Sequence, residues 1–208
     1  MITLHHLNNS RSQRILWLLE ELQLPYQIVH YQRDPVTRLA PPELKQIHPL
    51  GKSPVISDGQ LVIAESAAII EYLVQTYGGG QLMPKAATPD YFRYLEWLHF
   101  AEGSAMLPFL LALYTSRLGE AAAPLKPRIQ SEISNYLSYL DQALVKHDYL
   151  MGDEFSAADI QNSFVAEIAQ ARQLLDFFPN LASYTARFQA RPAYQRALQK
   201  GGEYTLGA

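Results

Sequence analysis

Residues 48–66, HPLGKSPVISDGQLVIAES, carry the pattern that decides the fold of the first part of the chain. Two short apolar runs, at 54–57 and 60–63, flank the pair Asp58-Gly59. An Asp-Gly pair between such runs predicts a β-hairpin with a type I′ turn, because both central residues of that turn need a positive φ. We therefore expect two antiparallel strands joined by a tight turn.

The segments around this hairpin predict two further strands and three helices. Apolar residues between 15 and 22 recur at i, i+3, i+4 and i+7, and those after residue 65 repeat this spacing, so both stretches have the apolar stripe of a helix. The predicted order is βαβ-α-ββ-α, with strands at 2–7, 26–31, 54–57 and 60–63 and helices at about 12–22, 43–47 and 65–77.

The chain changes character across the segment 78–89, which is rich in glycine and proline. No strand pattern follows it. Helices are predicted at about 89–117, 125–147, 156–171, 179–190 and 192–200. Pro108 is expected to kink or interrupt the first of them. We infer a domain boundary within this segment.

The composition restricts the class of protein. The 208 residues carry a net charge of -3 without a long basic run, which argues against nucleic acid and anionic membranes as partners. The lack of cysteine excludes disulfides, thiolate zinc sites and a cysteine nucleophile. The histidines are isolated or point to opposite faces of a strand, so no metal site is predicted. The most apolar segment, 106–114, is too short to span a bilayer and the N-terminus has no secretory pattern, so we expect a cytoplasmic protein.

The opening stretch also has groups that suit a small peptide with charged ends. A Glu65-Ser66 pair at a helix start combines free N–H groups, a hydroxyl and a carboxylate, which suit a ligand carboxylate and a ligand ammonium. Lys52 suits a second carboxylate, and the backbone of Val55 after Pro54 suits pairing with an extended peptide. Glutathione has this pattern of groups. Taken singly, each of these residues is more often a cap, a strand boundary or a solvated lysine.

Three segments together resemble the glutathione S-transferase superfamily. They are GKSPVISDGQLVIAESAAIIEYL at 51–73, SRSQRILWLLEELQLPYQ at 10–27 and FSAADI at 155–160. The first resembles the glutathione-binding segment of that family, in which the proline is cis and a Glu-Ser pair opens a helix. The resemblance implies an α+β fold with a thioredoxin-like domain at 1–78, a linker at 79–87 and an all-helical domain at 88–208.

The resemblance also implies an activity and partners. The expected protein is a homodimeric glutathione transferase with a role in detoxification, which conjugates reduced glutathione, its co-substrate, to hydrophobic electrophiles and needs no further cofactor. Another glutathione-dependent activity, such as that of a peroxidase, an isomerase or a dehalogenase, stays open at this point. A non-enzymatic binding or regulatory protein with this fold, or a carrier of hydrophobic molecules, stays open as well.

The group that activates the glutathione thiol is expected directly before the first helix. In the family a Tyr, Ser or Cys there donates a hydrogen bond to the thiolate, and this segment has neither Tyr nor Cys. The S-x-x-x-R spacing from Ser10 to Arg14 matches the serine-type members and favours Ser10, with Ser12 and Asn9 as alternatives. Outside this family, either serine would more often cap the helix. His48, in the context HPLGK, is placed near glutathione by the same resemblance.

Candidates for the electrophile site lie on the first long helix of the second half. They are Met106, Phe109 and Tyr114, and the resemblance implies a site between the two domains. An apolar stripe at helical spacing is more often part of a core or a dimer contact. The sequence does not identify the electrophile.

The segment FSAADI has a local explanation that involves no chemistry. Ser156 and Asp159 have the spacing of a capping box, and Phe155 and Ile160 have that of a hydrophobic staple. We therefore expect Asp159 to stabilise the fold and not to contact the substrate.

Overall fold

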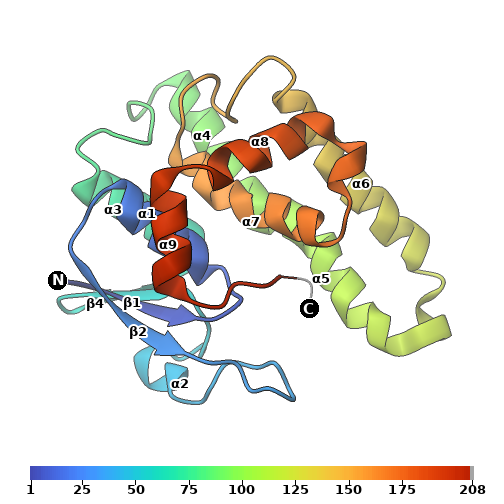
Figure 1. Ribbon diagram of the computed structural model, residues 1–208, viewed down its shortest axis with the longest axis horizontal. Coiled ribbons are helices and arrows are strands. Elements are labelled where there is room, and N and C mark those ends of the chain that lie inside the picture. Colours follow the sequence, from blue (N-terminus) through green and yellow to red (C-terminus); the bar gives the residue numbers. More distant parts are fainter. Residues whose placement is uncertain (207–208) are drawn as a thin grey trace. The chain divides into compact units, whose positions relative to one another are not determined.

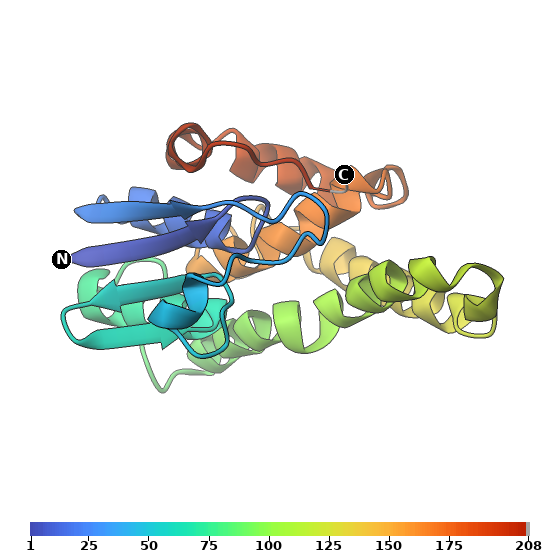
Figure 2. The ribbon, with the colours of Figure 1, turned by 90° about the horizontal axis from the view of Figure 1, so that it is seen from below.

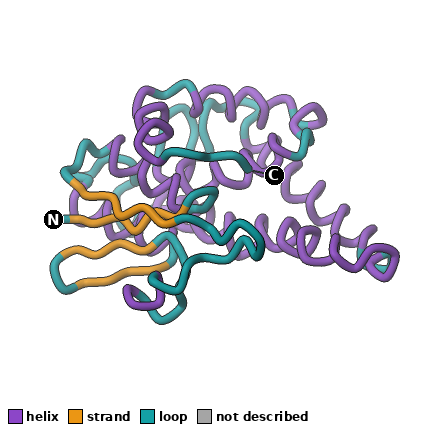
Figure 3. The backbone as a smooth tube through the Cα atoms, turned by 60° about the horizontal axis from the view of Figure 1, so that its bottom comes forward, coloured by secondary structure: helices purple, strands orange, loops and turns teal. Residues whose placement is uncertain are grey.

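The structure is a computed structural model that describes residues 1–206 and divides into two compact units. The first unit contains Met1–Met83 and the segment that begins at Arg187, and the second contains Pro84–Ala186. Residues 187–206, which the sequence assigned to the helical domain, therefore pack with the first unit. The strands β1 to β4 all lie in the first unit, and Figure 3 shows them in orange and the helices in purple.

The first unit is built on a mixed four-stranded sheet in the order β2-β1-β3-β4 (Figure 1). β1 pairs in parallel with β2 and antiparallel with β3, and β3 forms a hairpin with β4 (Figure 2). Its elements are β1 (Ile2–Leu7), α1 (Ser12–Glu21), β2 (Tyr26–Tyr31), α2 (Leu44–Ile47), β3 (Val55–Asp58), β4 (Leu61–Ala64), α3 (Ser66–Tyr77) and α9 (Pro192–Gly201). The predicted α+β class with a thioredoxin-like first part is confirmed.

The turn of the β3–β4 hairpin lies one residue later than predicted. Asp58 pairs with Leu61, so Gly59 and Gln60 form the loop, and only Gly59 of the two has a positive φ, of 61°. A glycine at the first central position is typical of a type II′ turn, so the predicted type I′ turn is wrong. Asp58 remains in the strand, where its carboxylate accepts a hydrogen bond of 2.9 Å from the hydroxyl of Tyr72.

Helix α1 is buried between neighbours on several sides. It packs against β1, α3 and the C-terminal helix α9, and every residue from Ser12 to Glu20 is buried. The Trp17 ring stacks on Phe188 with centroids 5.5 Å apart and meets Tyr194 edge-on at 5.2 Å. The C-terminal segment thus completes the hydrophobic core of the first unit.

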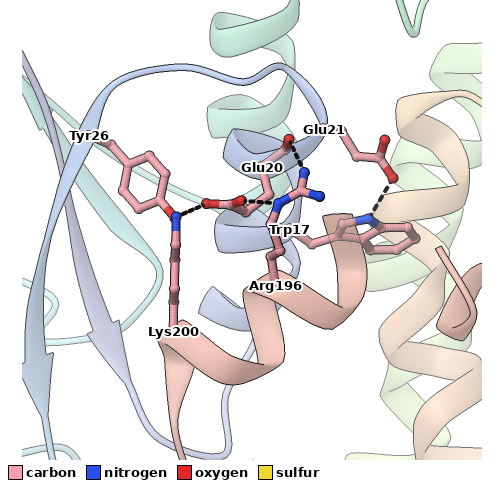
Figure 4. Close-up of polar contacts among 6 residues, drawn as sticks. All are labelled: Trp17, Glu20, Glu21, Tyr26, Arg196 and Lys200. Atoms are coloured by element: carbon pink, nitrogen blue, oxygen red, sulfur yellow. Dashed lines mark hydrogen bonds and ion pairs between the residues drawn. The ribbon is translucent and has the colours of Figure 1, made fainter. Parts of the chain in front are cut away.

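Glu20 of α1 is the centre of a polar cluster that attaches α9 (Figure 4). Its carboxylate forms ion pairs with Arg196 at 2.7 Å and Lys200 at 2.5 Å, and it accepts a hydrogen bond from the Tyr26 hydroxyl. Burial by itself would raise the pKa of Glu20, but the hydrogen bonds from Lys200, Tyr26 and Arg196 outweigh burial and lower it. The charged form of Glu20 is therefore the form that stabilises the fold.

We expect Glu20→Gln to reduce the loss of thermal stability on acidification. The folded state binds the Glu20 proton less tightly than the unfolded chain, so the stabilisation is complete above the ordinary glutamate pKa of about 4.3 and is lost as the pH falls. Melting temperatures measured between about pH 5 and about pH 2 should fall more steeply for the wild type than for the variant. Glu120→Gln, at an exposed site, is the matched control. Parallel curves for wild type and Glu20→Gln would contradict this role.

The second unit is helical apart from one bridge between Tyr149 and Gly152. A π-helical turn at Ala101–Ala105 interrupts the long helix predicted at 89–117. Pro108 has no backbone N–H to donate to the carbonyl of Ser104, and Ser104 lies in that π-helical turn. The interruption that we expected from Pro108 therefore occurs one turn before Pro108. The elements are α4 (Pro89–Phe100), α5 (Met106–Thr115), a 3-10 segment (Ser116–Ala122), α6 (Lys126–Ala143), α7 (Ala157–Ala171), a 3-10 turn (Leu175–Phe177) and α8 (Pro179–Gln189), which runs into the first unit.

The predicted capping box at the start of α7 is confirmed. Asp159 is fully buried, and its carboxylate accepts hydrogen bonds from the backbone N–H of Ser156 at 2.8 Å, the hydroxyl of Ser156 at 3.1 Å and the N–H of Leu150 at 2.9 Å. Burial raises the pKa of Asp159 to about 6 against the opposing effect of these bonds. Asp159 therefore attaches the preceding loop to α7 as well as capping the helix.

Candidate functional site

Three segments singled out in the sequence meet at one end of the sheet. β1 ends at Leu7, β3 begins at Val55 and β4 ends at Ala64. The ladder pairs Val55 with His5 and with Ala64, so these three strand ends lie side by side. The loops that carry Ser10, Pro54 and Glu65-Ser66 all leave the sheet here. The first unit therefore brings the predicted thiol activator and the predicted peptide-binding residues to the same end.

Ser10 lies in the loop between β1 and α1, immediately before the helix. Its side chain is 4% exposed, and its hydroxyl donates to the carbonyl of Leu7 at 2.7 Å. The same oxygen accepts from the backbone N–H of Ser12 at 3.2 Å. The positive end of the α1 dipole is adjacent, which favours negative charge beside this hydroxyl.

Neither candidate serine caps α1 in the expected manner. The N-cap residue is Arg11, which has no side-chain cap hydrogen bond. Ser12 is the first helical residue and is fully buried, with its oxygen 3.0 Å from Nδ1 of His6 and 2.8 Å from the oxygen of Ser10. Neither serine is therefore the N-cap of α1, although the Ser10 oxygen accepts from the N–H of the first helical residue, Ser12.

Asn9, the third candidate, has the left-handed φ of 50° that asparagine tolerates better than most residues. Its side-chain oxygen accepts from the backbone N–H of Thr205 at 2.5 Å, and its carbonyl accepts from Arg33 at 3.1 Å. Asn9 therefore fixes the loop to the C-terminal segment and to Arg33.

Ser66 begins α3 and has a buried cationic partner. A guanidinium nitrogen of Arg14 donates to the Ser66 oxygen at 2.6 Å, and both residues are buried. This contact joins the starts of α1 and α3. The sequence singled out Arg14 only through its spacing from Ser10, and the hydrogen bond to Ser66, 52 residues away, depends on tertiary structure.

Glu65 has a strained backbone at the N-cap of α3. Its φ of 66° and ψ of 116° lie outside the regions that non-glycine residues ordinarily adopt. Such conformations cost of order 1–3 kcal/mol and cluster at ligand-binding positions. Its side chain is exposed, so the carboxylate is accessible from solvent.

The remaining predicted glutathione-binding residues occupy the loop before β3. The Ser53–Pro54 bond is cis, as in the family motif. Val55 is buried within β3, which has β1 on one side and β4 on the other, so an added peptide can reach its backbone only at the beginning of the strand. Lys52 is exposed, and His48 is half-buried with its Nδ1 accepting from the N–H of Leu50 at 3.4 Å.

The three candidate electrophile residues differ in accessibility. Met106 and Phe109 are each 2% exposed, whereas Tyr114, two turns further along α5, is 62% exposed. The guanidinium of Arg172 lies 5.4 Å from the centre of the Phe109 ring. Only Tyr114 of the three presents its ring to solvent.

A separate apolar cavity of about 800 Å³ lies within the second unit. Its walls come from α5, α6 and the segment after α7, and include Ile129, Ile133, Leu137, Leu174, Phe177 and Phe178. The cations Arg172 and Lys126 also line it, but none of the three predicted electrophile residues does. Sequence reasoning missed these walls because they come from helices that are distant in the chain.

Two kinds of feature are absent from residues 1–206. None of the helices in that range is long and apolar enough to cross a membrane. Within the same residues, no three His, Asp or Glu side chains lie together in a way that would hold a metal ion.

Comparison with known proteins gives consistent matches over both units. The family model "Glutathione S-transferase, N-terminal domain" matches residues 1–75, and "Glutathione S-transferase, C-terminal domain" matches residues 91–192. Glutathione S-transferase 3 of Schizosaccharomyces pombe is 37% identical, over 99% of this chain and 90% of its own. Glutathione S-transferase 1 of Saccharomyces cerevisiae is 28% identical, over 96% and 95%.

Solved structures give the same picture. A glutathione S-transferase from Actinobacillus pleuropneumoniae is 35% identical, with a TM-score of 0.90 over 99% of this chain and 95% of that chain. A glutathione transferase family member from Pseudomonas fluorescens, solved with two glutathione bound, is 28% identical, with a TM-score of 0.80 over 95% and 92%.

Proposed function

Because the chain belongs to the glutathione S-transferase family, we propose that it is a glutathione transferase that uses Ser10 to activate the thiol of reduced glutathione. The thiolate then attacks a hydrophobic electrophile. The observation that carries this proposal is the meeting of Ser10, Pro54-Val55 and Glu65-Ser66 at one end of the sheet. The relative solved with two glutathione bound supports glutathione as the ligand.

The start of α3 holds the γ-glutamyl end of glutathione. Arg14 donates to the oxygen of Ser66, which leaves the Ser66 hydroxyl hydrogen for the ligand carboxylate. The guanidinium also adds positive charge beside the unpaired N–H groups of the helix start, and both favour an anion. The exposed carboxylate of Glu65 takes the ammonium. The strained φ of Glu65 is the feature expected where backbone conformation is set by ligand binding.

The loop before β3 holds the rest of the tripeptide. The backbone at the beginning of β3, at Val55, pairs with the cysteinyl residue in the manner of an added strand. Lys52 and His48 bind the glycine carboxylate end. Pro54 sets the direction in which the loop enters the strand.

Thiol activation needs a donor and positive potential at the sulfur, because the thiolate is the nucleophile. Rotation about the Cβ–Oγ bond of Ser10 turns its hydrogen from the Leu7 carbonyl to the sulfur. The N–H of Ser12 donates to the same oxygen and makes the Ser10 hydroxyl a stronger donor. Together with the adjacent α1 dipole, these contacts lower the thiol pKa of bound glutathione below its ordinary value of about 8.5.

Tyr114, which is exposed, is the candidate for direct contact with the electrophile, and Met106 and Phe109 support α5 beneath the surface. The homodimer, the cytoplasmic location and a role in detoxification stay predictions from the family resemblance.

Glutathione binding and turnover test the proposal together. We expect wild-type protein to bind reduced glutathione in a calorimeter and to conjugate it to a generic aryl halide. Glu65→Gln removes a charge-assisted contact of about 1.5–3 kcal/mol, so its Kd should rise at least about tenfold. Glu71→Gln, the same change further along α3, should bind like wild type.

Each result of this experiment has a defined meaning. Binding without turnover of several electrophile classes would favour the binding or carrier protein over the enzyme. Glutathione that does not bind, or that binds Glu65→Gln as tightly as wild type, would refute the assigned site.

A further inference from the structure

His6, one of the two buried histidines of β1, contacts Ser12 at the start of α1. His6 is 2% exposed, and its ring lies edge-on to His30 with centroids 5.6 Å apart. Burial is the main cause that lowers the pKa of His6 to about 4, and His30 adds to it, so His6 is neutral at neutral pH. A neutral imidazole has one donor nitrogen and one acceptor nitrogen.

The C-terminal helix decides which nitrogen of His6 carries the hydrogen. The backbone of Gly201 forms a hydrogen bond with His6 that raises its pKa, so the histidine is the donor in that bond. Nε2 is the nitrogen on that side, since a Cβ built on Gly201 would lie 3.3 Å from it. Nδ1 is therefore the acceptor and faces the Ser12 hydroxyl at 3.0 Å.

The Ser12 hydroxyl has one hydrogen and several acceptors within reach. Its oxygen accepts from the N–H of Leu7 at 3.2 Å. Its hydrogen can point to Nδ1 of His6 at 3.0 Å, to the Leu7 carbonyl at 3.1 Å or to the Ser10 oxygen at 2.8 Å. While the Ser10 hydroxyl donates to the Leu7 carbonyl, that carbonyl already has a hydrogen-bond donor. Among residues 1–206, buried Nδ1 of His6 has no donor other than Ser12, so it accepts the Ser12 hydrogen.

Thiolate binding changes this balance without any covalent step. When the Ser10 hydrogen turns to the sulfur, donation to an anion makes the Ser10 oxygen a stronger hydrogen-bond acceptor. That oxygen lies 2.8 Å from the Ser12 oxygen, so Ser12 turns its hydroxyl hydrogen from His6 to Ser10. A Ser10 oxygen that accepts this bond donates more strongly to the thiolate.

We propose that Ser12 is a positioning residue for thiol activation, whose hydroxyl hydrogen moves between a resting acceptor, Nδ1 of His6, and the oxygen of Ser10. This inference rests on the proposed function of Ser10. The contact of His6 with Gly201 of α9 favours the tautomer in which Nδ1 accepts from Ser12. No charged group is needed in the relay, because His6 stays neutral throughout.

The test is the pH profile of kcat/KM for the electrophile at saturating glutathione, which reports the thiol pKa in the bound complex. Ser12→Ala should raise that pKa and lower kcat/KM near neutral pH by about three- to tenfold, with KM for glutathione unchanged. Ser12→Thr, which keeps the hydroxyl, should restore the wild-type profile. Ser12→Cys fills the same space but its S–H is only a weak donor, so its profile should resemble that of Ser12→Ala. If Ser12→Ala does not fold, Ser12→Cys alone decides the test.

Two further variants separate this inference from its premise. Ser116→Ala removes an exposed hydroxyl that donates to a backbone carbonyl, and it should leave the profile unchanged. Ser10→Ala tests the premise itself. If Ser10→Ala raises the thiol pKa but folded Ser12→Ala and Ser12→Cys keep the wild-type value, the positioning role is refuted and the function of Ser10 stands. If Ser10→Ala keeps the wild-type profile, both are refuted.

Discussion

The Ser10→Ala variant is expected to lose at least about a hundredfold in kcat/KM while it still binds glutathione. Removal of one hydrogen-bond donor to an anionic reacting centre typically costs 10²–10³ in rate, about 2.7–4 kcal/mol. Glutathione binding should persist, since the hydroxyl of Ser10 contacts Leu7 and Ser12 and not Glu65, Ser66 or Lys52. The measurement is steady-state conjugation of glutathione to an aryl halide, together with calorimetric binding of reduced glutathione.

The outcome also decides between Ser10 and its neighbours. Full activity in Ser10→Ala would transfer the role to Ser12 or Asn9. Asn9 is the weaker alternative, because the bond from the N–H of Thr205 to its side-chain oxygen holds the amide toward the C-terminal segment. Loss of both turnover and glutathione binding would instead mean that Ser10 shapes the loop and does not act on the sulfur.

Asp159→Ala is expected to produce the largest loss of stability in the chain. The change leaves three buried donors, two from Ser156 and one from Leu150, without their acceptor. Each unsatisfied donor costs about 1–3 kcal/mol, so the free energy of unfolding should fall by at least about 3 kcal/mol. For a protein of this size that corresponds to roughly 10 °C in Tm.

Two measurements check this expectation. Asp153→Ala, at a side chain that is 82% exposed, should leave Tm nearly unchanged. Glutathione affinity of the folded fraction of Asp159→Ala should equal that of wild type, because the capping box lies in the second unit and has no part in the proposed site. An unchanged Tm with lost affinity would contradict the structural role of Asp159.

Local signals in the sequence predicted the elements and their order well. Period-two and helical patterns located every strand and most helices, and the capping box at Ser156 and Asp159 was predicted with its partners. The hairpin was predicted in the right place but one residue out of register, because the Asp-Gly signal does not tell which residue begins the loop. In the structure, Asp58 stays in its strand with a tyrosine bound to its carboxylate.

Features that depend on long-range contacts were not predictable. The apolar stripe of α1 indicates one buried face, yet Ser12, Arg14 and Glu20 are buried as well, because β1, α3 and α9 all pack against α1. The final helix was assigned to the helical domain for the same reason. The hydrogen bond between Arg14 and Ser66 spans 52 residues and has no local signature.

The candidate site was predictable only in part. The motif residues at Ser10, Pro54 and Glu65-Ser66 could be singled out in the sequence, and the structure gathers them at one end of the sheet. The positive φ of Glu65 and the orientation of the Ser12 hydroxyl toward His6 appear only in the folded chain. The electrophile residues were the least predictable, because a helical apolar stripe does not reveal which of its members stay exposed.

The most direct test of the central claim is a titration of the glutathione thiol in its complex with the wild-type protein. The thiolate absorbs in the ultraviolet where the thiol does not, so its fraction can be followed as the pH changes. We predict that bound glutathione ionises at least about one pH unit below the ordinary thiol value of about 8.5. Bound glutathione that ionises at the same pH as free glutathione would contradict the claim that this site activates the thiol.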